Sequence, residues 1–257
     1  MPTKKYLIGS VAWLALMLAS STIASPTEQL HRSSDKEVKA TIDSLAKLER
    51  NFEKSLDRSF KNSVLRSSTG EVAIGLFLED FSAMISELKK RISTNYAASS
   101  EVKSVLTQAS VVNTYMLQNP STKGADEWDA VAATLDQLAA SYFTTFPVPE
   151  GAVVRRIGDG ELTDAANRFG KFARDFAGLL KKQAGKVAEL KEDISAASAE
   201  LKSIQQFSKD IASRIRSNKP ASAVARQLFD SCEAIDEIVW NPAMPETIEP
   251  AWAEGAT

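Results

Sequence analysis

The chain has 257 residues, a formal net charge of −2, one histidine and one cysteine. This acidic balance argues against nucleic-acid binding, which needs an excess of lysine and arginine. A lone His31, on a segment without helical periodicity, leaves Ser-His-Asp and Cys-His catalysis without a credible base. A lone Cys232 rules out an intramolecular disulfide framework, and its place on an apolar stripe predicts a buried thiol. We expect a non-enzymatic protein with no catalytic residue, cofactor or metal, stabilised by its apolar core.

Residues 1–24 have the pattern of a secretory signal peptide. Lys4 and Lys5 precede an apolar run over 6–18, and small residues follow up to Ala24, where we place the cleavage. An uncleaved anchor helix is the alternative, although the run is shorter than the roughly 20 residues that a membrane span needs. The sequence therefore predicts a periplasmic or secreted protein with no stable membrane span after cleavage.

The first half of the mature chain has the spacing of four helices. Residues 25–35 contain a proline and show no periodicity, which indicates a flexible N-terminal segment. Apolar residues then recur at helical spacing over 36–66 and 71–97, and the short connection predicts an antiparallel hairpin. A third helix is expected over about 101–117, with Ser99 and Ser100 as capping residues, and a fourth over about 126–145.

A heptad pattern without proline extends over about 161–217. Its apolar face is wide in the first half, which needs several neighbours, and narrows in the second half towards the width of a coiled coil. The polar, glycine-containing stretch 181–186 is the place where a break would fall. Because the heptad register crosses it without a slip, we predict one very long helix. A last helix is expected to reach about Trp240.

The end of the chain, 241–257, holds three prolines, three glutamates and no basic residue. This composition predicts a disordered acidic tail. Trp252 is an exception, because a large aromatic side chain is seldom left in water, and we expect it to dock on its own bundle or on a partner. No segment alternates with period two. The predicted fold is all-α, an elongated antiparallel helical bundle without a sheet, forming one domain over 36–240.

Two functions fit this architecture. The first is helix-mediated association, with a second copy or with another protein, through the narrow stripe of the long helix. The alternative is a small-molecule sensor or binding bundle with a pocket lined by Trp128, Tyr142, Arg155 and Arg156, since paired arginines can hold a carboxylate or phosphate. The competing interpretation of the two arginines is a solvated loop or an ion pair with Asp159 or Glu161. An enzyme ranks third, because it needs a carboxylate pair in a cleft that the sequence does not reveal.

Overall fold

The computed structural model describes residues 32–67, 70–93 and 96–255. The structure is mostly helical and divides into two compact units. The N-terminal unit is Ser33–Asp159, and the C-terminal unit contains the described residues from Gly160 onwards. This division differs from the single domain expected over 36–240. The predicted signal peptide, its cleavage site and His31 lie outside the described residues, and within these residues no helix has the length and apolar character to cross a membrane.

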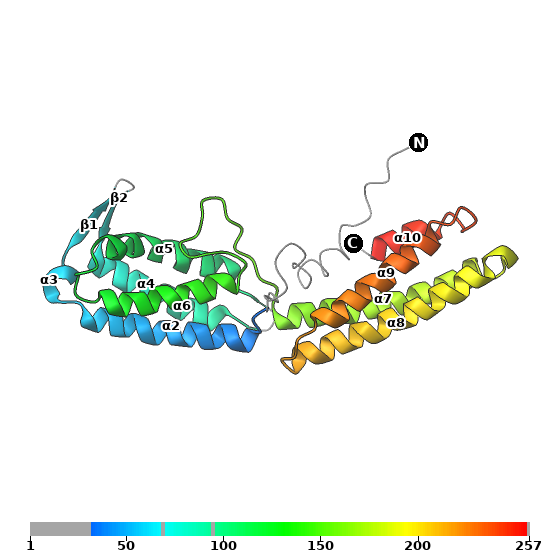
Figure 1. Ribbon diagram of the computed structural model, residues 1–257, viewed down its shortest axis with the longest axis horizontal. Coiled ribbons are helices and arrows are strands. Elements are labelled where there is room, and N and C mark those ends of the chain that lie inside the picture. Colours follow the sequence, from blue (N-terminus) through cyan, green and yellow to red (C-terminus); the bar gives the residue numbers. More distant parts are fainter. Residues whose placement is uncertain (1–31, 68–69, 94–95, 256–257) are drawn as a thin grey trace. The chain divides into compact units, whose positions relative to one another are not determined.

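The N-terminal unit is an antiparallel four-helix bundle (Figure 1). Its helices are α2 (Asp35–Ser55), α4 (Ile74–Arg91), α5 (Ser99–Gln118) and α6 (Ala125–Ala140). Each helix contacts the next along the chain, and α6 returns to pack against α2. This is the arrangement that short connections between amphipathic helices favour.

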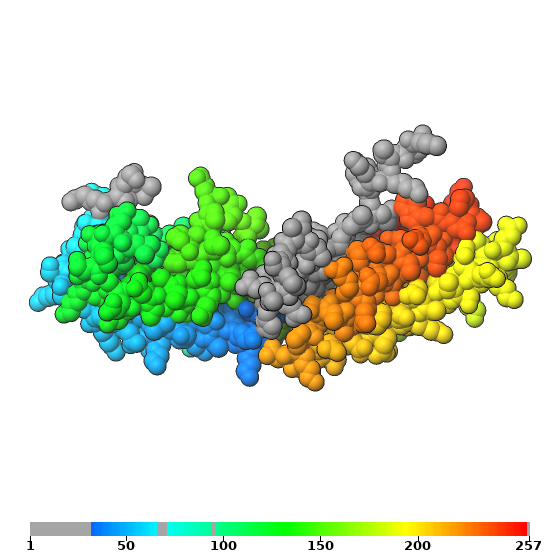
Figure 2. Space-filling view, in the orientation of Figure 1, coloured from blue at the N-terminus to red at the C-terminus, as the bar shows by residue number. Residues whose placement is uncertain are grey.

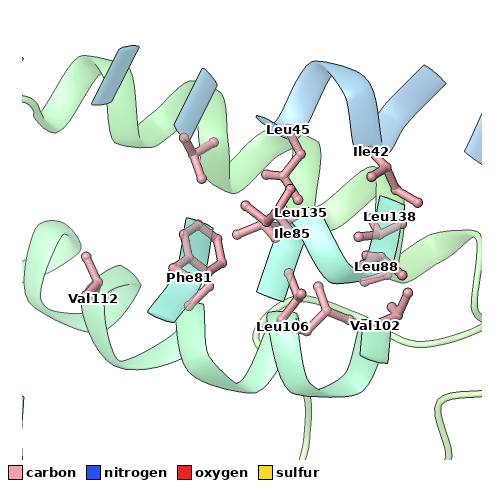
Figure 3. Packing of buried hydrophobic residues seen from close by; sticks show 14 of the residues in the cluster. Ile42, Leu45, Phe81, Ile85, Leu88, Val102, Leu106, Val112, Leu135 and Leu138 are labelled. Atoms are coloured by element: carbon pink, nitrogen blue, oxygen red, sulfur yellow. The ribbon is translucent and has the colours of Figure 1, made fainter. Parts of the chain in front are cut away.

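The bundle core consists of layers to which each helix contributes a side chain (Figure 3). The eight side chains of the two layers named next are each at most 1% exposed, so the apolar stripes predicted from the sequence do form the core. One layer contains Ile42, Leu88, Val102 and Leu138, and the next contains Leu45, Ile85, Leu106 and Leu135.

The prediction of no sheet is wrong at the first helix connection. The helix expected over 36–66 ends at Ser55, and a short helix, α3 (Arg58–Lys61), follows it. The antiparallel strands β1 (Val64–Ser67) and β2 (Gly70–Ala73) come next. The Asp57 carboxylate accepts the Phe60 N–H at 2.7 Å, which starts a new turn and ends the helix predicted over 36–66.

Two further boundaries differ from the sequence prediction. Helix α6 ends at Ala140 because Phe143 adopts a left-handed conformation with φ 56°, and the N–H groups of Phe143 and Thr144 close the helix on the carbonyls of Ala140 and Ala139. Neither serine caps the first turn of α5, whose N-cap residue is the left-handed Ala98. The Ser99 hydroxyl instead accepts the Arg156 N–H at 3.2 Å.

In the C-terminal unit, two helices replace the predicted long helix. They are α7 (Asp159–Gln183) and α8 (Lys191–Arg216), with the 3-10 turn η1 (Ala188–Leu190) between them. The break begins within the polar stretch 181–186, at Gln183, and the stretch contains Gly185, where a Cβ atom would lie 2.3 Å from the Lys181 carbonyl oxygen. Helix α9 (Ser222–Val239) packs along α8 (Figure 1), and Cys232 is buried as predicted.

The prediction of a disordered tail over 241–257 is also wrong, because Ile248–Gly255 within it forms helix α10. Pro250 lies in the first turn, where a helix tolerates proline. The docking of Trp252 on its own bundle is confirmed. Its side chain is 1% exposed, its ring lies 5.5 Å from that of Phe172 and 5.1 Å from that of Phe176 between centroids, and its Nε1–H donates to Asp236.

The burial of Trp252 predicts that α10 contributes to the stability of the C-terminal unit. We expect Trp252→Ala to lower the free energy of unfolding by about 3–5 kcal/mol, because it removes a buried aromatic ring and leaves a cavity. Trp240→Ala, at a tryptophan that is 37% exposed, is the control and should cost less. Urea unfolding of the two variants measures the difference, and equal stabilities would show that α10 is not held by Trp252.

A buried carboxylate in the N-terminal unit predicts a pH dependence. Glu49 is buried on the core face of α2, and its Oε1 has no hydrogen-bond partner among the described residues. Burial, and secondly the charge of Glu53, raise the pKa of Glu49. A raised carboxyl pKa favours folding below the pKa of the unfolded chain, and this contribution is lost as the pH rises through the folded-state pKa.

Glu49→Gln should therefore stabilise the protein at neutral pH, and its advantage should shrink as the pH falls towards 4 and Glu49 becomes protonated. The exposed Glu79→Gln serves as the control. Thermal unfolding of both variants across this pH range tests the expectation. An effect of Glu49→Gln that does not change with pH would contradict it.

Candidate functional site

The first predicted site residue, Trp128, lies in the core of the N-terminal unit. Its ring meets the Phe52 ring edge to face at 4.9 Å between centroids, and its Nε1–H donates to the Asn113 side-chain oxygen at 3.0 Å. Trp128 is near the start of α6 and Tyr142 follows the end of that helix, so the two are about 20 Å apart at 1.5 Å per residue. The structure therefore does not bring Trp128 together with the other three predicted site residues.

Tyr142, Arg155 and Arg156 do come together. The Tyr142 side chain is buried, its hydroxyl donates to the Ala97 carbonyl oxygen, and burial raises its pKa. The Arg155 N–H donates to the Tyr142 carbonyl oxygen at 3.4 Å, which ties the two chain segments, while the Arg155 side chain is exposed. Between Tyr142 and Arg155 the connection from α6 to α7 forms a loop, the green trace that rises from the bundle in Figure 1, and part of this loop projects from the surface of its unit in Figure 2.

Arg156 is buried and forms the centre of a polar cluster at this end of the bundle. Its Nη1 lies 2.5 Å from Asp35 Oδ1 in an ion pair without hydrogen-bond geometry, and its Nη2 donates to the Ser33 carbonyl oxygen at 2.9 Å. Asp159 Oδ1 lies 3.9 Å from Nη2. We call Arg156, Asp35, Asp159 and Ser33 the Arg156 cluster.

The two aspartates of the Arg156 cluster also cap each other. The Asp35 N–H donates to Asp159 Oδ2 at 2.8 Å, and the Asp159 N–H donates to Asp35 Oδ2 at 3.0 Å. Both are the first residues of helices, where backbone N–H groups lack partners and a negative charge is favourable. Each carboxylate thus lies beside the Arg156 guanidinium and also accepts a backbone N–H at the first residue of a helix. Because these groups are engaged with one another, the cluster acts as a structural contact.

A second location combines a cleft with exposed apolar groups. It is the end of the N-terminal unit at which α2 and α5 end and α4 and α6 begin, together with α3 and the two strands; we call it the hairpin end. A cleft of about 460 Å³, here the β1 cleft, opens there. One side is lined by Asp57, Ser59, Phe60, Ser63, Val64 and Leu65, and the other by Tyr115, Thr122 and Lys123.

The hairpin end also carries a second cleft of about 540 Å³, which reaches from Glu53 and Lys61 to Ser86 on α4. Three aliphatic side chains are exposed at this end, Val64 at 43%, Leu76 at 63% and Leu117 at 68%. Scattered exposed apolar residues are normal on a protein surface. At the hairpin end, Val64 lines the β1 cleft and Leu76 follows Gly75, which lines the second cleft, so exposed apolar groups and clefts occur together there.

Sequence reasoning missed the hairpin end because its parts are far apart in the chain. The β1 cleft joins residues 57–65 to residues 115–123, and neither stretch carries a chemical motif. The available signal was the change of register after Ser55, where Asp57, Ser59 and Ser63 interrupt a charged and apolar helical pattern.

The Arg156 cluster predicts a large loss of stability when one charge is removed. Asp35→Asn should lower the free energy of unfolding by about 3–5 kcal/mol, since it leaves the arginine buried without its counter-charge. Asp43→Asn is the matched control, because the Lys89–Asp43 ion pair is exposed, and it should cost at most about 1 kcal/mol.

The double variant Asp35→Asn with Arg156→Gln should lose less free energy of unfolding than the two single variants lose together, because it leaves no lone buried charge. Urea unfolding of the single and double variants closes this cycle. Additive losses would show that Arg156 and Asp35 are not coupled.

The comparisons with known proteins find no match for this chain: no family model matches it, and no curated protein or solved structure is significantly similar to it.

Proposed function

We propose that this protein is exported and acts without catalysis, by associating with a protein partner at the hairpin end of its N-terminal unit. Export rests on the signal-peptide pattern of residues 1–24. The observation that carries the association is the presence of two clefts and three exposed aliphatic side chains at one end of the bundle. Apolar groups beside a cleft are typical of protein interaction sites.

This proposal keeps the association expected from the sequence but moves it to another surface. The narrow stripe in the second half of the heptad pattern corresponds to α8. Its apolar residues, including Leu201, Ile204 and Ile211, are fully buried within the C-terminal unit, where α9 packs along α8. That stripe is therefore engaged in the fold of its own chain.

The small-molecule alternative receives less support from the geometry. Trp128 and Tyr142 are buried and hydrogen-bonded to protein atoms, and Arg156 is paired with Asp35. A ligand at these side chains would have to displace contacts that the bundle already makes. The two clefts described above are lined by other residues.

The test is a comparison of surface variants in the native envelope. The double variant Leu76→Ser with Leu117→Ser removes two exposed apolar groups at the hairpin end. The matched control, Phe143→Ser with Val153→Ser, removes two exposed apolar groups elsewhere on the N-terminal unit. Chemical cross-linking followed by purification should recover the same partner with the unchanged protein and the control, and much less of it with the hairpin-end variant.

The opposite dependence, or association that neither variant changes, would contradict the proposal. Circular dichroism of the variants checks that both remain folded. Sedimentation of the purified protein separates association with a second copy from association with a different protein.

A further inference from the structure

The β1 cleft has a strand edge as one of its walls. Ser63, Val64 and Leu65 line it, and residues of β2 do not. Side chains of successive strand residues point to opposite faces, and Val64 is exposed while Leu65 is buried. Because residues from both faces of β1 line the cleft, the cleft borders the edge of the strand that β2 leaves uncovered.

The register of the hairpin shows which backbone groups this edge presents. The Ile74 N–H donates to the Ser63 carbonyl oxygen at 3.0 Å, and Leu65 lies opposite Val72. In an antiparallel pair the residues alternate between bonding to the partner strand and pointing away from it. Ser63 and Leu65 therefore face β2, and the N–H and carbonyl of Val64 point away from it, on the side of the cleft.

The remaining lining residues indicate what the occupant carries. The rings of Phe60 and Tyr115 lie 5.7 Å apart between centroids and offer an apolar contact. The Asp57 carboxylate is engaged with the first turn of α3, and the Ser63 hydroxyl donates to the Phe60 carbonyl oxygen at 2.7 Å. The exposed Lys123 is the cation among the lining residues, and it favours an acidic group on the occupant.

We propose that the β1 cleft binds an extended, acidic segment of the partner protein by strand addition to β1. The segment exchanges hydrogen bonds with the Val64 backbone, places an apolar side chain against Phe60 and Tyr115, and brings a carboxylate to Lys123. An exposed strand edge is a ready template for such pairing, and the cleft has the volume of a site for a short segment. This inference rests on the proposed association at the hairpin end and specifies its chemistry.

The probe is a fluorescein-labelled peptide of alternating valine and glutamate, whose binding to the full mature protein is followed by fluorescence anisotropy. Val64→Pro removes the outward N–H at the first residue of an edge strand, a position where proline is tolerated. We expect it to weaken binding about tenfold, the effect of losing about one good hydrogen bond. Val153→Ser is the control, because Val153 is exposed on the same unit but does not line the cleft, and it should not change binding.

Two further arms do not depend on the folding of Val64→Pro. A peptide N-methylated at alternate residues cannot pair along one of its edges and should bind more weakly than the parent. Lys123→Glu should weaken binding of the glutamate peptide and favour a valine-lysine peptide. No binding of the parent peptide, or binding that N-methylation and Lys123→Glu leave unchanged, would overturn strand addition.

The outcome is separable from that of the proposed function. If the hairpin-end variant loses the partner but Val64→Pro and N-methylation leave peptide binding unchanged, the proposed binding surface is correct and strand addition is wrong. If the peptide binds as expected but neither Val64→Pro nor the hairpin-end variant changes recovery of the partner from the native envelope, the cleft binds peptides and the proposed function is wrong.

Discussion

The buried guanidinium of Arg156 is the constraint on which the closure of the N-terminal unit depends. A buried charge is costly unless a counter-charge and hydrogen-bond partners meet it, and here Asp35, Ser33 and Asp159 come from the two ends of the unit. The Arg156 backbone adds Ser99, which ties the start of α5 to the same place. A buried ion pair is weak evidence for high stability but strong evidence for a specific arrangement, since few other positions of these segments would satisfy the charges.

Helix periodicity predicted the core well because burial of an apolar stripe is a local property. Leu45, Leu88 and Leu138 fall at positions that a 3.6-residue period assigns to one face of each helix, and all three are buried. The same argument fails at Gly185. Two consecutive helices that each bury an apolar stripe can keep a continuous heptad register, so the register does not reveal whether the chain turns between them.

The candidate site was less predictable for a related reason. The predicted ligand contacts Trp128 and Tyr142 both lie on an apolar stripe, and the bundle buries them and satisfies their polar atoms itself. The hairpin end gave no periodic signal, since each strand has four residues and a period of two needs a longer run to be recognised. Its cleft exists only after residues 57–65 and 115–123 have met in the fold.

The short hairpin is hard to account for as a contribution to stability alone. A two-stranded hairpin is marginal in water by itself, and here Leu65 and Val72 anchor it to the bundle core. A helical continuation of α2 into α4 would have needed no strand edge, which proteins usually cover or blunt because it can pair with other chains. The edge of β1 is limited to a few residues and is set between α3 and the Tyr115 side of a cleft. These walls restrict which extended segments can reach Val64, so the geometry that limits uncontrolled strand pairing is the same geometry that would make pairing with one partner selective.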